Sequence, residues 1–149
     1  MKNTSLAVSL LAIALALAGC SKEAPKSEKS AGGGAASGAS EVKIGHVGPL
    51  TGGIAHLGKD NENGARLAVE EANAAGIKIG GKDVKFTLVA EDDQADPKVG
   101  TTVAQKLVDA KVAGVVGHLN SGTSIPASPI YNGAGIPVIS GSATNPKLT

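Results

Sequence analysis

The pattern of hydrophobic and polar positions divides the chain into three parts. Residues 6–17 form an apolar run of mainly Leu, Ala and Ile. Residues 21–40 consist largely of Lys, Glu, Ser, Ala and Gly and show no apolar periodicity. From Glu41 onward, short apolar segments alternate with longer amphipathic ones, which is typical of a folded α/β segment.

Four apolar segments in the folded part predict strands. They cover about residues 42–49, 84–90, 112–117 and 136–139. The second alternates strictly, with Val84, Phe86 and Leu88 on one face. The third is wholly apolar, as expected of a strand that is covered on both faces.

Three amphipathic segments between these strands predict helices over about residues 58–75, 96–109 and 123–132. Asp96 followed by Pro97 is a strong helix start, with Asp as N-cap and Pro at the first helical position. Residues 80–83 are predicted to form a turn. The alternation of strand and helix predicts an α/β fold, a Rossmann-like parallel sheet with helices on both faces and right-handed crossovers.

Ligands of such sheets bind beyond the carboxyl ends of the strands, so the loops at 48–59, 91–96, 117–123 and 140–146 are of interest. After the third strand, Ser121, Gly122 and Thr123 open a helix, whose free N–H groups and dipole suit a carboxylate. Residues 140–144 place more hydroxyl groups at the same sheet edge. These residues fit capping and turn roles equally well, so both interpretations stay open.

A nucleotide-binding enzyme is the alternative from a different class. Residues 53–60 nearly match the phosphate-loop pattern G-x-x-x-x-G-K-[ST] between a strand and a helix. Asp60 stands where the pattern needs a hydroxyl, and its charge would repel phosphates. A Gly-rich strand-to-helix turn is therefore favoured. The serine-nucleophile pattern G-x-S-x-G is not met either, so no catalytic role is predicted.

The histidines and the acidic run give no metal site by their spacing. His46 and His118 are interpreted as isolated polar residues near the rim of the sheet, whereas His56 lies in a candidate binding loop. The acidic residues 91–93 are interpreted as a strand exit and Asp96 as a helix cap. The sequence thus predicts neither a metal nor a cofactor.

Charge and aromatic content argue against nucleic-acid binding. The chain has 14 Lys and Arg residues against 13 Asp and Glu residues. Loss of the leader removes Lys2 and no acid, so the two signs then balance, without the basic excess of a nucleic-acid binder. Phe86 and Tyr131 are the only aromatic residues, too few for a base-stacking platform.

Cys20 is the only cysteine and follows Leu17, Ala18 and Gly19, directly after the apolar run. The run is short for a membrane span and fits a signal peptide. Small residues before a cysteine resemble the bacterial lipobox, in which the cysteine is lipidated and becomes the new N-terminus. We therefore expect a signal peptide at 1–19, a lipid anchor at Cys20, a flexible tether over 20–40 and a location in the periplasm or cell envelope.

The folded part resembles the leucine/isoleucine/valine-binding proteins of ABC transporters, which are type I periplasmic binding proteins. The resemblance runs from Val42 to Thr149. It is carried by Lys43-Ile44-Gly45, Gly48-Pro49-Leu50-Thr51-Gly52, Asn63-Gly64-Ala65, Glu70-Glu71-Ala72-Asn73, Asp92-Asp93, Asp96-Pro97, Gly117-His118-Leu119 and Ser142-Ala143-Thr144.

The resemblance implies a two-lobed clamshell that closes on a free amino acid, such as leucine, isoleucine or valine, and hands it to a transporter permease without catalysis. It places Ser121 at the ligand's α-carboxylate or ammonium group, with further contacts from Ser142 and Thr144. The first loop would cover the ligand's side chain with Leu57, beside His56, where relatives often have an aromatic residue. A receptor for an amide or another amino acid on the same fold is the alternative.

Two departures from the family pattern bear on these expectations. Some members link the loops after the second and third strands by a disulfide, and the matching positions here are Ala95 and Asn120. The segment 41–149 is expected to be only part of a first lobe, because a full member adds a hinge and a second lobe. The acid that pairs with the ligand's ammonium group in the family would lie in that second lobe.

Overall fold

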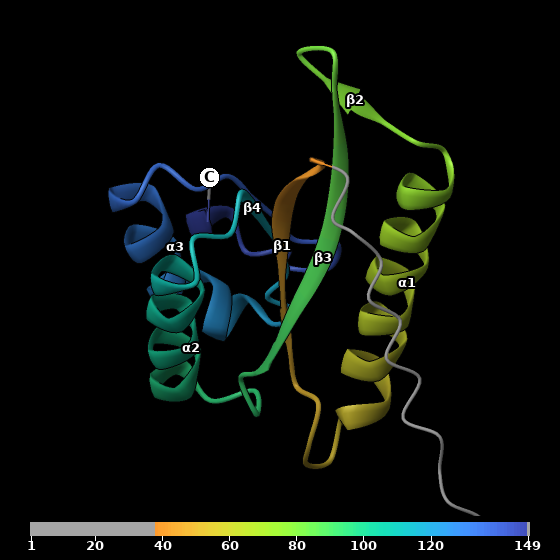
Figure 1. The fold of residues 1–149 in the computed structure, drawn as a ribbon. Coiled ribbons are helices and arrows are strands. Elements are labelled where there is room, and N and C mark those ends of the chain that lie inside the picture. Colours follow the sequence, from red (N-terminus) through yellow and green to blue (C-terminus); the bar gives the residue numbers. More distant parts are fainter. Residues whose placement is uncertain (1–37, 149) are drawn as a thin grey trace, which may run out of the picture. The chain divides into compact units, whose positions relative to one another are not determined.

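The computed structural model describes residues 38–148 (Figure 1). The expected signal peptide, the expected lipidation site at Cys20 and most of the expected tether lie outside the described residues. Within them, no helix is long and apolar enough to cross a membrane. The elements are β1 (Ser40–Gly48), α1 (Ala55–Ala74), β2 (Lys78–Ile79), β3 (Lys82–Asp92), α2 (Pro97–Asp109), β4 (Gly114–Val116), α3 (Ser121–Gly133), β5 (Val138–Ile139) and the 3-10 turn η1 (Pro146–Leu148).

The strands form one sheet in the order β2-β3-β1-β4-β5. Four of them, β3, β1, β4 and β5, run parallel, which confirms the predicted α/β fold. The edge strand β2 was not predicted and pairs antiparallel with β3. The turn between them is Gly80-Gly81, where both residues have a positive φ that glycine adopts at little cost. The predicted turn over 80–83 is therefore two residues too long, because Lys82 and Asp83 already belong to β3.

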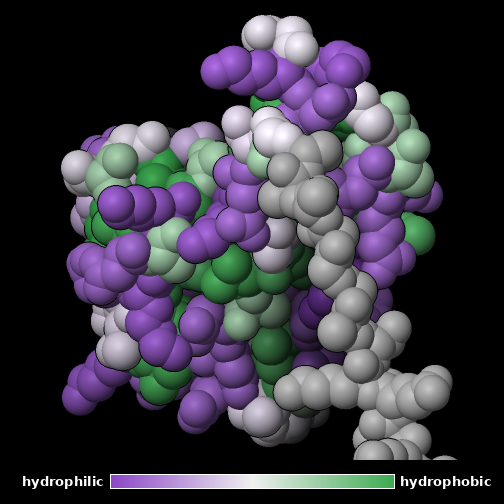
Figure 2. Space-filling model, in the orientation of Figure 1, coloured by the Kyte–Doolittle hydropathy of each residue, from purple (hydrophilic) through white to green (hydrophobic). Residues whose placement is uncertain are grey.

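Helices cover both faces of the sheet, as predicted. In Figure 1, α1 lies on one side and α2 and α3 pack together on the other. The hydrophobic core lies on the α2–α3 side and consists of Val47, Val103, Ala104, Leu107, Val112, Val115, Ala127 and Tyr131. Figure 2 shows apolar surface along the sheet between the more polar surfaces of the helices.

Helix α2 begins as the sequence predicts. Oδ1 of Asp96 accepts the backbone N–H groups of Lys98 and Val99, at 2.8 and 3.0 Å. Helix α1 begins at Ala55, three residues before the predicted start, and its N-cap Ile54 makes no side-chain cap. The early start went unpredicted because no capping residue marks it.

Candidate functional site

The topology places four loops at one edge of the sheet, beyond the carboxyl ends of β1, β3, β4 and β5. The chain first moves from β1 to β3 on one side and then to β4 on the other side of β1. The loops after β1 and β4 therefore leave the sheet in opposite directions. Such a switch point is where open α/β sheets leave a crevice for a ligand.

Ser121 and Thr144 meet at this edge although 23 residues separate them. The Ser121 hydroxyl oxygen accepts the backbone N–H of Thr144 at 3.2 Å and that of Asn145 at 3.3 Å. A serine oxygen has two lone pairs and one proton, so these two bonds fill its acceptor capacity and leave its proton to donate.

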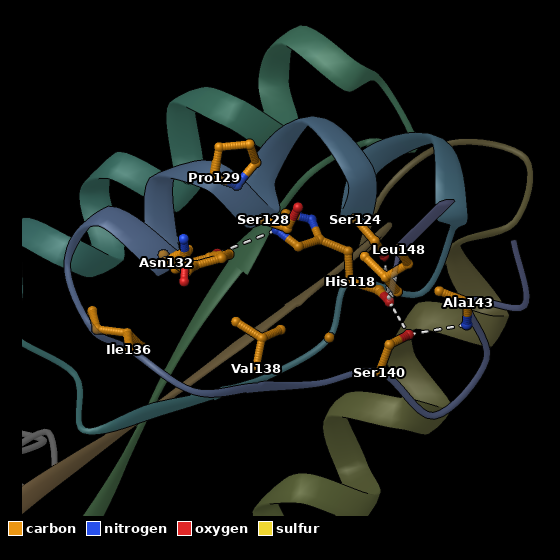
Figure 3. A pocket seen from close by; sticks show the side chains of 12 residues that line it. His118, Ser124, Ser128, Pro129, Asn132, Ile136, Val138, Ser140, Ala143 and Leu148 are labelled. Atoms are coloured by element: carbon orange, nitrogen blue, oxygen red, sulfur yellow. Dashed lines mark hydrogen bonds between the residues drawn. The ribbon is translucent and has the colours of Figure 1, made fainter. Parts of the chain in front are cut away.

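Ser142 lies at the same edge, but its hydroxyl donates to the carbonyl oxygen of Leu119 at 2.6 Å. Its proton therefore joins the loop after β5 to the loop after β4. Ser140, which we did not single out as a site residue, makes a second such link. Its hydroxyl donates to the carbonyl oxygen of His118 at 2.7 Å and accepts the N–H of Ala143 at 3.0 Å (Figure 3).

His56 and Leu57 lie in the first turn of α1, and Leu57 is 43% exposed. Within residues 38–148 no hydrogen bond joins either of them to Ser121 or Thr144. One turn further along α1, Asn61 lines a cavity of about 110 Å³ together with Gly141, Ser142 and other residues of the strand ends. Helix α1 thus borders the hydroxyl-bearing loops at Asn61.

His118 is fully buried in a hydrogen-bonded network, so its interpretation as an isolated residue near the rim was wrong. Its Nδ1 lies 2.8 Å from Oδ2 of Asp93, and its Nε2 lies 3.2 Å from the hydroxyl of Tyr131. Burial alone would raise the pKa of Asp93, but hydrogen bonds from His118 and the N–H of Ala95 bring that pKa below its usual value. Burial, and then the charge of Asp93, raise the pKa of Tyr131.

His46 is also buried, with 1% of its surface exposed, and does not lie at the rim as interpreted. Neither ring nitrogen has a hydrogen-bond partner within the described residues. Burial lowers the pKa of this imidazole, and the nearby charge of Glu62 opposes the shift. Nearby backbone groups of Gly58 and Val116 also favour a higher pKa of His46, although neither is hydrogen-bonded to the ring. The side chain is therefore held neutral near pH 7.

The acidic run at the end of β3 supports the loops beside it. Oδ1 of Asp92 accepts the N–H groups of Leu50 and Gln94, and Oδ2 accepts the hydroxyl proton of Thr51. Asp92 thereby ties the loop after β1 to the loop after β3. Among residues 38–148, no three His, Cys, Asp or Glu side chains are grouped to hold a metal ion.

Residues 53–60 do not form a phosphate loop. Gly58 and Lys59 lie inside α1, and the Lys59 ammonium pairs with Glu62 at 3.0 Å. Arg66 pairs with the other oxygen of Glu62 at 2.7 Å. The lysine that would reach a phosphate is thus held along its own helix.

A cavity with a volume of about 610 Å³ lies beside α3 and β5 (Figure 3). Its lining includes Ser140 and Ala143 but none of the predicted contacts Ser121, Thr144, His56 and Leu57. The predicted site residues therefore do not enclose this cavity.

Comparison with known proteins now identifies the family. Residues 41–149 match the family model described as periplasmic binding protein. The chain belongs to the periplasmic binding protein family. A Leu/Ile/Val-binding protein homolog from Brucella abortus is 45% identical over 109 residues, which are 73% of this chain and 29% of that protein.

Solved structures of transporter substrate-binding proteins agree with this assignment. The substrate-binding protein of a branched-chain amino-acid transporter from Streptococcus pneumoniae, solved with isoleucine, matches with a TM-score of 0.66 and 38% identity, over 72% of this chain and 30% of that one. A solute-binding protein from Rhodopseudomonas palustris, solved with 3,4-dihydroxybenzoic acid, matches with a TM-score of 0.59 and 30% identity, over 69% and 27%. The chain thus spans less than a third of the length of these relatives.

Proposed function

We propose that residues 41–149 form part of the first lobe of a substrate-binding protein that captures free branched-chain amino acids for an ABC importer. The observation that carries this proposal is the meeting of Ser121 and Thr144 at the start of α3. The Brucella abortus relative, whose name refers to leucine, isoleucine and valine, supports the choice of ligand. The role is binding and release, without catalysis.

The start of α3 offers donors suited to a carboxylate. The N–H groups of Thr123 and Ser124 are taken by the carbonyl oxygen of Asn120, whereas those of Ser121 and Gly122 have no partner within residues 38–148. These two N–H groups, the spare proton of the Ser121 hydroxyl and the helix dipole all favour a negative group. We propose that the α-carboxylate of the amino acid binds here, because an ammonium group would find no spare acceptor on Ser121.

We propose the other ligand contacts from where their residues lie around the start of α3. Thr144, whose backbone is held by Ser121, would direct its hydroxyl to the ligand's polar end. Ser142 has its proton committed to Leu119 and would offer only lone pairs, which suit an ammonium group. His56 and Leu57, at the start of α1, would contact the ligand's side chain and set the preference among amino acids.

A second ligand class has a specific observation in its favour. The Rhodopseudomonas palustris structure holds a carboxylic acid that has no ammonium group. A site whose main contacts are hydrogen-bond donors to a carboxylate could also bind such an acid.

Titration calorimetry on the complete polypeptide that the gene encodes separates these functions. The panel consists of leucine, isoleucine, valine, an amide and 3,4-dihydroxybenzoate, with ATP as the test of a nucleotide site. We expect the three branched-chain amino acids to bind and ATP to give no heat. Binding of the amide or the aromatic acid alone would leave the fold assignment intact and overturn the choice of ligand.

We also propose that the protein is exported and held at the membrane of the cell envelope by a lipid on Cys20, where it serves a transporter permease. The lipobox-like sequence before Cys20, directly after the apolar run, supports this proposal. The mature protein should partition into the membrane fraction, and Cys20→Ala should release it or block its processing. Equal membrane recovery and normal cleavage of both forms would contradict the anchor.

A further inference from the structure

The two loops that carry the proposed ligand contacts continue beyond the sheet. The last sheet-like bond between β4 and β5 runs from the N–H of Gly117 to the carbonyl oxygen of Ile139, at 2.9 Å. Past this point, three serine hydroxyls connect the loops: Ser140 to His118, Ser142 to Leu119, and Ser121 to the N–H groups after Ala143. Side chains thus replace the backbone ladder where the ligand would bind.

Ser140 uses every hydrogen-bonding position of its hydroxyl for this purpose. The proton goes to the carbonyl oxygen of His118 at 2.7 Å. The oxygen accepts the N–H of Ala143 at 3.0 Å and lies 3.4 Å from the N–H of Ser142. Because one donor and two acceptor positions are filled, this hydroxyl has nothing left for a ligand.

The partner of Ser140, His118, is anchored by three further side chains, which come from the end of β3 and from α3. The His118 ring is held by Asp93 at the end of β3 and by Tyr131 on α3, and all three side chains are buried. Its carbonyl oxygen also lies 3.3 Å from the hydroxyl of Ser124 on α3. The anchor therefore belongs to the interior of the protein, whereas residues 141 and 142 and 144–147 are exposed.

We propose that Ser140 is a positioning residue: it fastens the loop 140–145 to the buried His118 and so holds Thr144 against Ser121 before a ligand arrives. The inference rests on the proposed function for its consequence in binding, but its structural part can be measured without a ligand. Preorganised donors bind a ligand more tightly because the loop loses little conformational entropy when the ligand binds.

Amide hydrogen exchange on the ligand-free protein tests the positioning. Ser140→Ala should speed exchange at Ala143, which loses its acceptor. It should also speed exchange about three- to tenfold at Thr144 and Asn145, although their acceptor Ser121 is unchanged. The reason is that the loop loses the stabilisation of roughly one hydrogen bond. A purely local role would alter Ser142 and Ala143 alone.

Ser140→Thr supplies the conservative rescue. It keeps the hydroxyl, and its added methyl group has room because Ser140 lines the 610 Å³ cavity. Exchange at Thr144 and Asn145 should return to the wild-type rate. Ser128→Ala is the matched control, because that hydroxyl lines the same cavity but bonds only to Ile125 within α3.

Leucine titration completes the experiment. Ser140→Ala should weaken binding about three- to tenfold, with wild-type affinity in Ser140→Thr and Ser128→Ala. The inference is overturned if exchange changes stop at Ala143, if Ser140→Thr behaves like Ser140→Ala, or if Ser140→Ala binds leucine normally. A wild-type protein that binds no leucine overturns the proposed function instead, and the exchange data alone then decide the positioning role.

Discussion

Gly58→Ala is expected to destabilise the protein by about 1–3 kcal/mol or more, although alanine is the better helix former. A Cβ at Gly58 would lie 2.1 Å from the carbonyl oxygen of Pro49 and 2.6 Å from its carbonyl carbon. Since a backbone carbonyl cannot rotate out of the way as a side chain can, α1 would have to move off the loop after β1. Urea unfolding followed by circular dichroism gives the change in the free energy of unfolding.

Gly64→Ala in the same helix is the matched control. A Cβ at Gly64 would have no atom within 4 Å, so alanine should stabilise the protein by about 0.5–1 kcal/mol through helix propensity alone. The two substitutions should therefore have opposite signs. Stabilisation by both would show that α1 does not rest on Pro49 as closely as described.

Ser121→Ala is expected to weaken leucine, isoleucine and valine binding by about ten- to a hundredfold. A hydrogen bond to a charged group contributes roughly 1.5–3 kcal/mol, and about 1.4 kcal/mol corresponds to tenfold in affinity. The loss should be similar for all three ligands, because Ser121 would hold the carboxylate that they share. Titration calorimetry with each amino acid on the complete polypeptide measures it.

Thr102→Ala is the control for Ser121→Ala. Its hydroxyl lies on α2 and bonds to the carbonyl oxygen of Lys98 in the same helix. Its removal should leave affinity unchanged. Unaltered affinity in Ser121→Ala would disprove the carboxylate assignment, whereas a loss that differs strongly between leucine and valine would place Ser121 at the side chain instead.

Features that depend on neighbouring residues could be predicted from the sequence. The cap of α2 involves only Asp96 and the N–H groups two and three residues later, so the pair Asp96-Pro97 was sufficient. The meeting of Ser121 and Thr144 also lay within reach, because both follow parallel strands whose carboxyl ends share one edge.

Features that depend on distant pairing could not be predicted. Asp93 lies 25 residues from His118, and Tyr131 lies 13 residues on the other side, so no spacing rule connects the three. Strand β2 has only two residues, both exposed, which is too short for an alternating pattern. The bond between Ser140 and His118 depends on strand register, which sequence separation alone does not reveal.

The buried imidazole of His46 links unfolding to proton uptake. In the unfolded chain this group binds a proton near pH 6.5, whereas burial lowers its pKa in the folded protein. The unfolded state therefore holds more protons just below that pH, and the free energy of unfolding falls as the pH drops through this range. Because His46 lies in β1, between β3 and β4, mild acid should loosen the centre of the sheet before the carboxylates titrate. The urea midpoint of unfolding should decline between pH 7.5 and about 5.5.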